Sequence, residues 1–351
     1  MRDGRYGVGI VGTGAIAAVH ALAADSLEDT RLVACYNHNR AKGDAFAGKY
    51  GIVNHASLED FMADEDVDIV MVATPSASHL EACMSAIAHG KKALLVEKPL
   101  EATTEACDRI IRAAEEKGVV LSGIFQSRFF PSSVEVKKAL DEGRFGRIVL
   151  VDAQFKWYRS QEYYDSTPWH GSMAIGGGGV LMNQGIHAID LMSWFGGDVE
   201  SISSFGGALG HERIDVEDTS VASLRFTSGA LGVIEGTTAT WPGFLKKVEI
   251  CGSDGSVILE DESIKAWSFK DERPEDEEIR RRYATSSTAG GANDPMAISS
   301  SGHVACLKDV VDSLKDGRRP LIDGLEARKA VAIVEACYRS AASGGAPVRP
   351  R

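Results

Sequence analysis

The sequence predicts two α/β domains, a doubly wound parallel sheet over residues 1–123 and a mostly antiparallel sheet over residues 124–351. The length of 351 residues exceeds the usual domain size of about 100–200 residues. Short apolar runs alternate with amphipathic stretches of helical length through the first third of the chain. Further on, the strand-like runs alternate apolar and polar residues, which is typical of antiparallel strands with one solvated face.

The first domain is predicted from buried strands of four to seven residues with helices between them. The expected strands are Tyr6–Val11, Arg31–Tyr36, Val67–Ala73, Ala93–Val96 and Val119–Gly123. The expected helices are Ala15–Ala24, Ala41–Tyr50, Ser78–His89 and Thr103–Lys117. Such alternation builds a parallel sheet that binds its ligand at the carboxyl ends of the strands.

The second domain is predicted from longer strands with a period of two. These strands are Ile148–Tyr158, Thr219–Phe226, Leu231–Thr240 and Lys247–Cys251. Glu260–Arg282 is dense in charge and Ala284–Ser301 is rich in Ser, Gly and Ala, so we expect an exposed, mobile connection or a lid there. His303–Gly345 is expected to form two helices around Arg318-Arg319-Pro320.

Composition narrows the classes of partner. The chain has 38 Lys and Arg against 50 Asp and Glu, and the net charge of −12 argues against a nucleic-acid partner. The six cysteines form no C-x-x-C pair, so neither a metal site nor a disulfide framework is expected. The N-terminus lacks the pattern of a signal peptide and no stretch approaches the roughly 20 apolar residues of a membrane span, so a cytoplasmic protein is expected.

A dinucleotide-binding motif lies between the first strand and the first helix. The run GIVGTGAIA contains G-x-G-x-x-A. Gly12 permits the tight turn, Gly14 lets the backbone approach a pyrophosphate, and Ala17 allows close contact between helix and sheet. Ala15 and Ile16 at the helix start belong to the same predicted cofactor site. The alternative is a turn of small residues with no ligand.

The end of the second strand bears on the choice between NAD and NADP. The chain has no carboxylate there until Asp44, whereas an acidic residue would bind the ribose hydroxyls of NAD. Asn37 is a weaker acceptor for the ribose hydroxyls than a carboxylate and does not repel a 2′-phosphate strongly. Arg40 could pair with the 2′-phosphate of NADP. Arg40 could equally be a solvated charge at a helix start. Both cofactors stay open.

Lys98 follows the expected strand Ala93–Val96 at its carboxyl end. A lysine beside an oxidised, cationic nicotinamide and partly out of water favours its neutral form, so it could accept the proton of an alcohol that loses hydride. The alternative is an ordinary surface charge.

A second candidate group lies in the glycine-rich run GGGGVLMNQGIHAID. Asn183 and His187 are four residues apart, and on a helix this spacing puts both on one face. They could hold a substrate hydroxyl while His187 exchanges its proton near neutral pH, with Asp190 orienting the ring. The alternative is a buried histidine whose hydrogen bond to Asp190 is purely structural.

Several of these motifs together resemble one family. GIVGTGAIAAVH, ATPSASH, VEKP, QSRFFP and GGGVLMNQGIHAID closely resemble the glucose-fructose oxidoreductase, inositol dehydrogenase and rhizopine-catabolism (Gfo/Idh/MocA) family. The later stretches TATWPGF, ICGSDGSVILE and GRRPLIDGLEARKAVAIVEACYRSA fit as well, so the resemblance covers nearly the whole chain.

The resemblance implies a Rossmann domain joined to an α/β domain with an open sheet that often serves as the interface of homodimers or homotetramers. It implies that His187 is the catalytic acid and base, with Lys98 shaping the proton path and the position of the substrate. Inositol dehydrogenases of the family have Asp where this chain has Asn183, so the family's Asp-assisted proton relay does not carry over directly.

The resemblance also implies supporting residues. Thr74, Pro75, His79 and Glu97 are expected beside the cofactor. The expected substrate pocket contains Gln126, Arg128, Trp157, Tyr158, Arg159, Tyr163, Tyr164 and Trp169. The aromatic residues among them could instead be core or interface packing.

The resulting expectation is hydride transfer between NAD or NADP and an alcohol or ketone carbon of a sugar, a cyclitol or a sugar derivative. Two other activities are open at this stage. One is a glycosidase that uses transient oxidation by bound NAD, and the other is a sensor that binds NAD(P) without turnover.

Overall fold

The computed structural model describes residues 3–285 and 300–351, which divide into two compact units. Unit 1 comprises Met1–Gln126 with Ser299–Arg328, and unit 2 comprises Ser127–Ile298 with Lys329–Arg351. The division therefore differs from the expected domains 1–123 and 124–351, because Ser299–Arg328 belongs to unit 1. Its helix α11 (Ser301–Asp316) packs on α1 (Ala17–Ser26) and on strands of the first sheet.

Unit 1 contains a six-stranded sheet in the order β3-β2-β1-β4-β5-β6. Its strands are β1 (Tyr6–Val11), β2 (Thr30–Tyr36), β3 (Val53–Asn54), β4 (Ile69–Val72), β5 (Ala93–Val96) and β6 (Val120–Gly123). All pairs are parallel, which confirms the doubly wound sheet. The strand order reverses between β1 and β4, and ligands of such sheets bind outside the carboxyl ends at that point.

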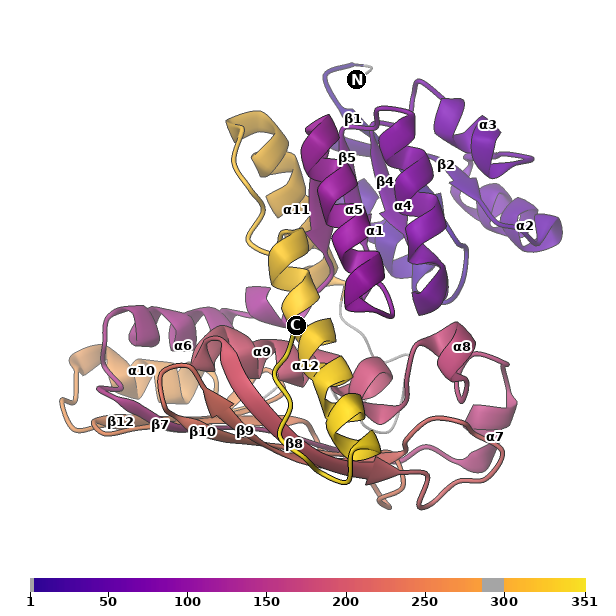
Figure 1. Ribbon diagram of the computed structural model, residues 1–351. Helices are drawn as coiled ribbons and strands as arrows, with labels where there is room; N and C mark the ends of the chain where they lie inside the picture. The colour runs from indigo at the N-terminus through magenta and orange to yellow at the C-terminus, as the bar shows by residue number, and fades with distance from the viewer. Residues whose placement is uncertain (1–2, 286–299) are drawn as a thin grey trace. The chain divides into compact units, whose positions relative to one another are not determined.

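Helices cover the first sheet. Besides α1 and α11 they are α2 (Arg40–Tyr50), α3 (Leu58–Ala63), α4 (His79–Ala88) and α5 (Thr104–Lys117). Helices α4 and α5 lie side by side (Figure 1). The sequence specifies both ends of α5, since the Thr103 side chain accepts a hydrogen bond from the Ala106 N–H and Gly118 takes a left-handed conformation.

Unit 2 contains a seven-stranded sheet in the order β13-β12-β11-β7-β10-β9-β8. Its strands are β7 (Ile148–Lys156), β8 (Val199–Gly207), β9 (Thr219–Phe226), β10 (Leu231–Thr237), β11 (Lys247–Gly252), β12 (Gly255–Glu260) and β13 (Ser263–Phe269). Only the pair β7 and β10 is parallel among these strands, which confirms the mostly antiparallel sheet. Burial alternates along β9, so one face of the sheet is packed and the other is solvated.

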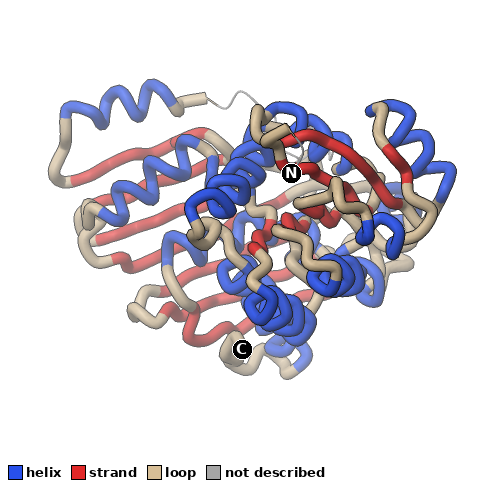
Figure 2. Tube along the Cα trace, turned by 90° about the horizontal axis from the view of Figure 1, so that it is seen from above, coloured by secondary structure: helices blue, strands red, loops and turns tan. Residues whose placement is uncertain are grey.

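The helices of unit 2 lie on one face of its sheet (Figures 1 and 2). The longer ones are α6 (Pro131–Asp141), α9 (Ile186–Gly196), α10 (Pro274–Arg282) and α12 (Gly324–Ala342). The short helical segments of the chain are η1 (Ser76–Ser78), η2 (Gln126–Phe129), α7 (Gln161–Asp165), α8 (Met173–Gly176) and η3 (Val180–Gly185). Helices α11 and α12 confirm the two-helix prediction for the end of the chain. Within residues 3–285 and 300–351, no helix has the length and apolar character of a membrane span.

The expectation of an exposed connection over Glu260–Arg282 is wrong, because this stretch forms β13 and α10. The buried carboxylate of Asp276 fixes α10 in place. It accepts hydrogen bonds from two guanidinium nitrogens of Arg144, from Trp267 Nε1 at 2.6 Å and from the Arg273 N–H at 2.7 Å. Most of the Ser/Gly/Ala-rich stretch predicted to follow lies in 286–299, outside the described residues.

Candidate active site

The glycine turn after β1 has the shape that a dinucleotide requires. Gly12 has φ +93°, and a Cβ there would lie 2.6 Å from the carbonyl oxygen of Ala73. A Cβ on Gly14 would meet no atom within 4 Å, so protein packing does not require glycine there. Ala17 is fully buried where α1 begins. The turn is therefore tight on the protein side and open at Gly14, which fits a backbone that a pyrophosphate approaches.

The residues after β2 are held by polar contacts. Asn37 Nδ2 donates to Thr13 Oγ1 at 2.6 Å and Asn37 Oδ1 accepts from the Asn39 N–H at 2.8 Å, so this side chain connects β2 to the glycine turn. Arg40 is exposed at the start of α2, and its Nε lies 3.5 Å from a carboxylate oxygen of Asp44. An exposed pair of this kind contributes little energy, so Arg40 could turn to a phosphate at small cost.

The loop after β4 is tied to the loop after β5 by His79. Its Nε2 lies 3.0 Å from the carbonyl oxygen of Thr74, and its Nδ1 lies 3.0 Å from that of Pro99. His79 is buried and both of its ring nitrogens face backbone oxygens, so it orders the loops. Pro75 is exposed, and the buried Thr74 Oγ1 has no hydrogen-bond partner among the described residues. The unpaired hydroxyl fits a ligand contact at this loop.

Lys98 follows β5, at the carboxyl edge of the sheet that also carries the glycine turn. Burial lowers the pKa of its ammonium group, and the charge of Glu97 opposes this shift only in part. The neutral amine is thus more accessible than in a free lysine, as a proton acceptor requires. Gln126 follows β6 in the same unit, and its buried Oε1 has no partner among the described residues.

Glu97 is held between two buried histidines. His20 Nε2 of α1 lies 2.7 Å from Glu97 Oε1, and His303 Nε2 of α11 lies 3.6 Å from the same atom. Burial alone would raise the pKa of Glu97, but the hydrogen bonds and charges of the two histidines outweigh it and hold the pKa well below its usual range. The carboxylate also accepts the Lys98 N–H at 3.2 Å. Sequence reasoning missed both histidines, since no spacing connects them to Glu97.

In unit 2, Asn183 and His187 lie on a helical segment that differs from the single regular helix expected. Asn183 belongs to the π-helical η3 and His187 to the first turn of α9, which continues from it. Both side chains are partly exposed, and Asn183 Nδ2 donates to the carbonyl oxygen of Gly178 at 3.1 Å. Segments of π-helix inside α-helices occur frequently at functional sites.

Arg128 and Asp190 form a buried ion pair in unit 2. Arg128 Nε donates to Asp190 Oδ2 at 2.9 Å and Nη2 donates to Oδ1 at 2.7 Å, with both side chains 1% exposed. The sequence suggested Asp190 as a partner of His187 and Arg128 as a substrate contact. The pair itself was not predicted, and it follows from the need of a buried guanidinium for a carboxylate partner. The substrate contact of Arg128 and the contact between Asp190 and His187 stay predictions.

Four of the predicted pocket residues, one of which is Arg159 itself, form a cluster with His170. The guanidinium carbon of Arg159 lies 5.2 Å from the Trp157 ring centre and 5.5 Å from that of Tyr163. Tyr163 stacks on His170 at 3.9 Å, and Trp169 lies 4.3 Å from the same imidazole. This arrangement joins cation–π and stacking contacts in one cluster.

The other two predicted aromatic residues have partners that explain them. Tyr158 packs against Trp241 at 5.0 Å, and the Tyr164 hydroxyl lies 2.6 Å from Thr238 Oγ1. Gln184, which sequence reasoning did not select, reaches the cluster from η3, and its Nε2 donates to the Tyr163 hydroxyl at 3.4 Å.

Comparison with known proteins agrees with this arrangement. Residues 6–125 match an oxidoreductase family with an NAD-binding Rossmann fold (GFO/IDH/MocA), and residues 133–258 match the GFO/IDH/MocA C-terminal domain. These two matches cover most of the chain, the first over the six-stranded sheet and the second over most of the seven-stranded sheet.

Two relatives match over almost the full length, and a third matches over about three quarters of it. The WlbA dehydrogenase from Bordetella pertussis, solved in complex with NADH and UDP-GlcNAcA, is 31% identical with a TM-score of 0.87, and the match covers 98% of both chains. The myo-inositol 2-dehydrogenase of Thermotoga maritima is 25% identical over 95% of both chains. The inositol 2-dehydrogenase of Rhizobium meliloti is 27% identical over 72% of this chain and 75% of its own length.

Proposed function

The chain belongs to the GFO/IDH/MocA family of oxidoreductases, and from this premise we propose that it oxidises or reduces a secondary alcohol or ketone carbon of a sugar derivative. The observation that carries the proposal is Lys98, an amine with a pKa lowered by burial, in the unit that also holds the glycine turn. Lys98 also follows β5 at the carboxyl edge of the sheet, where parallel sheets bind their ligands, and an amine that loses its proton readily can act there as a proton acceptor.

Bound at the glycine turn, a nicotinamide dinucleotide supplies the carbon that accepts or gives the hydride. Gly12 and Gly14 shape the turn for the pyrophosphate at the N-terminal end of α1, where the helix dipole favours an anion. Asn37 and Arg40 lie where the adenosine ribose is expected, and the loop of Thr74 and Pro75 lines the same edge. Either NAD or NADP is compatible with these residues.

We assign the proton transfer to His187 and Lys98, as the sequence predicts. His187 takes the hydroxyl proton during oxidation and returns it during reduction. Lys98 orients the hydroxyl and shares the proton, and Asn183 holds the hydroxyl with its amide. Because deprotonation of Lys98 is easier than that of a free lysine, we expect the oxidation rate to rise with pH below the usual titration range of lysine.

For the substrate we propose a hexose derivative with several hydroxyl groups, bound at the Arg159 cluster. Trp157 Nε1 and Gln184 Oε1 are buried and have no hydrogen-bond partner among the described residues. A donor and an acceptor left unpaired in a protein interior are costly unless a ligand pairs them, and sugar hydroxyls can do both. UDP-GlcNAcA is the first compound to test, because it is bound by the WlbA relative.

The experiment mixes the purified protein with NAD⁺ or NADP⁺ and with UDP-GlcNAcA, myo-inositol or glucose, and follows the absorbance of reduced cofactor. We expect turnover, and we expect Lys98→Ala and His187→Ala each to lower kcat by about 100-fold or more. The exposed residues Lys117 and His89 supply the control variants Lys117→Ala and His89→Ala, which should keep full activity. Full activity in Lys98→Ala or His187→Ala would remove the role assigned to that residue.

Relatives of this chain are named dehydrogenases, which favours hydride transfer over glycosidase activity and over binding without turnover. A homodimer or homotetramer stays part of the proposal. Phe205 and Val221 are paired across β8 and β9 and are 67% and 51% exposed. Exposed apolar pairs on a sheet face favour association with the sheet of a second subunit. Light scattering of the purified protein measures the mass of the assembly and so tests this proposal.

A further inference from the structure

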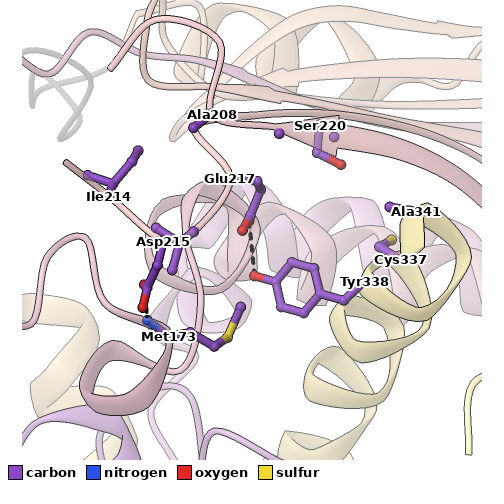
Figure 3. A pocket seen from close by; sticks show the side chains of 12 residues that line it. Met173, Ala208, Ile214, Asp215, Glu217, Ser220, Cys337, Tyr338 and Ala341 are labelled. Carbon is purple, nitrogen blue, oxygen red and sulfur yellow. Dashed lines mark hydrogen bonds between the residues drawn. The ribbon is translucent and has the colours of Figure 1, made fainter. Parts of the chain in front are cut away.

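We propose that Glu217 and Tyr338 are positioning residues that hold the segment carrying Asn183 and His187, an inference that rests on the function proposed for His187. The two side chains meet on the wall of a cavity of about 380 Å³ within unit 2 (Figure 3). Neither residue is predicted from the sequence as part of a site.

Glu217 receives three consecutive backbone N–H groups at the start of η3. Its Oε2 accepts from Gly179 at 3.1 Å, its backbone oxygen from Val180 at 2.9 Å and its Oε1 from Leu181 at 2.9 Å. The first N–H groups of a helix have no partner inside the helix, and a carboxylate is the strongest acceptor available to them. Glu217 therefore caps the N-terminal end of this helical segment, although it lies far away in the sequence. No neighbouring side chain caps that end.

Tyr338 of α12 completes the arrangement. Its hydroxyl donates to Glu217 Oε1 at 3.0 Å and lies 3.3 Å from the Gly179 nitrogen. Burial, together with the charge of Glu217, raises the pKa of Tyr338 well above its ordinary value, so the hydroxyl keeps its proton and stays a donor. Glu217 thus links α12 to the start of η3.

The glycine-rich run is explained by this contact. A Cβ on Gly179 would lie 1.8 Å from the backbone oxygen of Glu217, and a Cβ on Gly178 would lie 2.2 Å from the Tyr338 hydroxyl. No side chain fits at either position while these contacts persist. The run therefore brings the backbone against Glu217 and Tyr338, and its glycines do not need a bound phosphate to explain them.

From this anchor, backbone and side-chain hydrogen bonds lead to the predicted catalytic residues. The Asn183 N–H donates to the Gly179 carbonyl at 2.9 Å, while its side chain donates to Gly178. Val180 and Leu181 are completely buried, and η3 continues directly into α9, where His187 lies. A shift of the backbone at Gly179 would therefore move Asn183 and His187 with it.

The test compares Glu217→Gln, Tyr338→Phe and Asp215→Asn at pH 8. Burial raises the pKa of Glu217 to about 7, so its carboxyl is ionised at that pH and can accept all three donors. The amide NH₂ of Gln would face a backbone N–H instead. Asp215 lines the same cavity but is exposed. Its carboxylate accepts the Met173 N–H at 2.6 Å, away from the start of η3, which makes it a matched control (Figure 3).

Two measurements are made on each variant. Amide hydrogen exchange of the peptide covering residues 179–187 reports the anchoring without any activity. Kinetics with NAD⁺ and UDP-GlcNAcA separate kcat from the KM for NAD⁺. For Glu217→Gln we expect exchange at least tenfold faster in this peptide and kcat at least tenfold lower, with the KM for NAD⁺ unchanged. Tyr338→Phe should shift both readouts in the same direction by less, and Asp215→Asn should shift neither.

Unchanged exchange in Glu217→Gln and Tyr338→Phe would overturn the anchoring. Faster exchange with unchanged kcat would overturn the positioning role even though the hydrogen bonds exist. Failure of the proposed function has a different signature, since His187→Ala would then keep its activity while the exchange results for Glu217→Gln stand. Tyr338→Phe retains the ring and provides the test should Glu217→Gln fold poorly.

Discussion

At the scale of single residues, glycine is required for different reasons at the two positions of the turn after β1. Gly12 is constrained by the protein, since a Cβ would collide with the Ala73 carbonyl and its φ of +93° disfavours other residues. Gly14 has open space, so only a ligand would require its lack of a side chain. Substitution by alanine should separate these two reasons.

We predict that Gly12→Ala lowers the free energy of unfolding by about 1–3 kcal/mol even without cofactor. Gly14→Ala should leave the unfolding transition of the free protein within about 0.5 kcal/mol of the wild type, yet weaken NAD⁺ binding at least tenfold. Urea unfolding and a cofactor titration measure the two effects. Unchanged NAD⁺ affinity in Gly14→Ala would show that no pyrophosphate approaches this turn.

Arg40 gives a prediction about cofactor choice. Its pair with Asp44 is exposed and loose, so removing the guanidinium costs little stability. If Arg40 binds the 2′-phosphate, Arg40→Ala should raise the KM for NADP⁺ about tenfold and change the KM for NAD⁺ by less than twofold. Lys49→Ala, a change at the far end of the same helix, is the control. Equal changes for both cofactors would contradict a phosphate contact.

The residues that sequence could identify are those whose role follows from local position. Gly12, Gly14 and Lys98 are predictable because they lie at strand ends where ligands of parallel sheets bind. Glu217 and His303 are not, because their partners lie far away in the sequence and only the fold brings them together. Buried polar residues of this kind have no period or motif of their own.

At the scale of elements, strands β8, β12 and β13 are absent from the sequence-based prediction. Strand β8 contains few large apolar residues, and β12 and β13 are joined by the two residues Asp261 and Glu262. Asp261 has a positive φ of 50°, which a polar residue tolerates in a tight turn. The many charged residues of Glu260–Arg282 suggested an exposed connection, whereas in the structure the buried pair of Asp276 and Arg144 holds α10. Composition alone cannot distinguish an exposed charge from a buried, paired one.

The anchor of α10 can be tested through Asp276. Asp276→Ala would leave the Arg144 guanidinium, whose side chain is 5% exposed, without its carboxylate. We predict that the free energy of unfolding falls by about 3 kcal/mol, as when one partner of a buried ion pair is removed. Glu277→Ala, at the next and exposed position of the helix, should change it by less than about 0.5 kcal/mol. Urea unfolding of both variants measures these free energies. Similar decreases in the two variants would contradict the role of Asp276 in holding α10.

Glu217 predicts how stability depends on pH. Burial raises its pKa to about 7 in the folded protein, above the value near 4.3 of an unfolded chain. Its protonated form therefore stabilises the fold at low pH, and this contribution is lost as pH rises from about 4.3 through 7. Relative to Glu217→Gln, which cannot ionise, the wild type should lose up to about 3 kcal/mol between pH 4.5 and 8. A difference in unfolding free energy that stays constant over this range would contradict the raised pKa.

At the scale of the whole molecule, the division of the chain is not contiguous in sequence. Ser299–Arg328 belongs with the first 126 residues, although most of unit 2 lies between them. The amphipathic pattern of α11 predicts a helix, but periodicity cannot say which sheet it covers. Its contacts with α1, and those of His303 with Glu97, assign it to unit 1.

This assignment predicts which parts of the chain respond together to the cofactor. NAD⁺ at 100 times its Kd should stabilise the unit that binds it by about 2.7 kcal/mol, which slows exchange through unfolding of that unit about 100-fold. The amides of α11 should then slow together with those of α1, while those of β9 in unit 2 change less. Hydrogen exchange with and without NAD⁺ measures this, and Gly14→Ala should reduce the effect in both helices. If NAD⁺ slowed exchange in α1 but left the exchange rate of α11 unchanged, the segment Ser299–Arg328 would not unfold as part of unit 1.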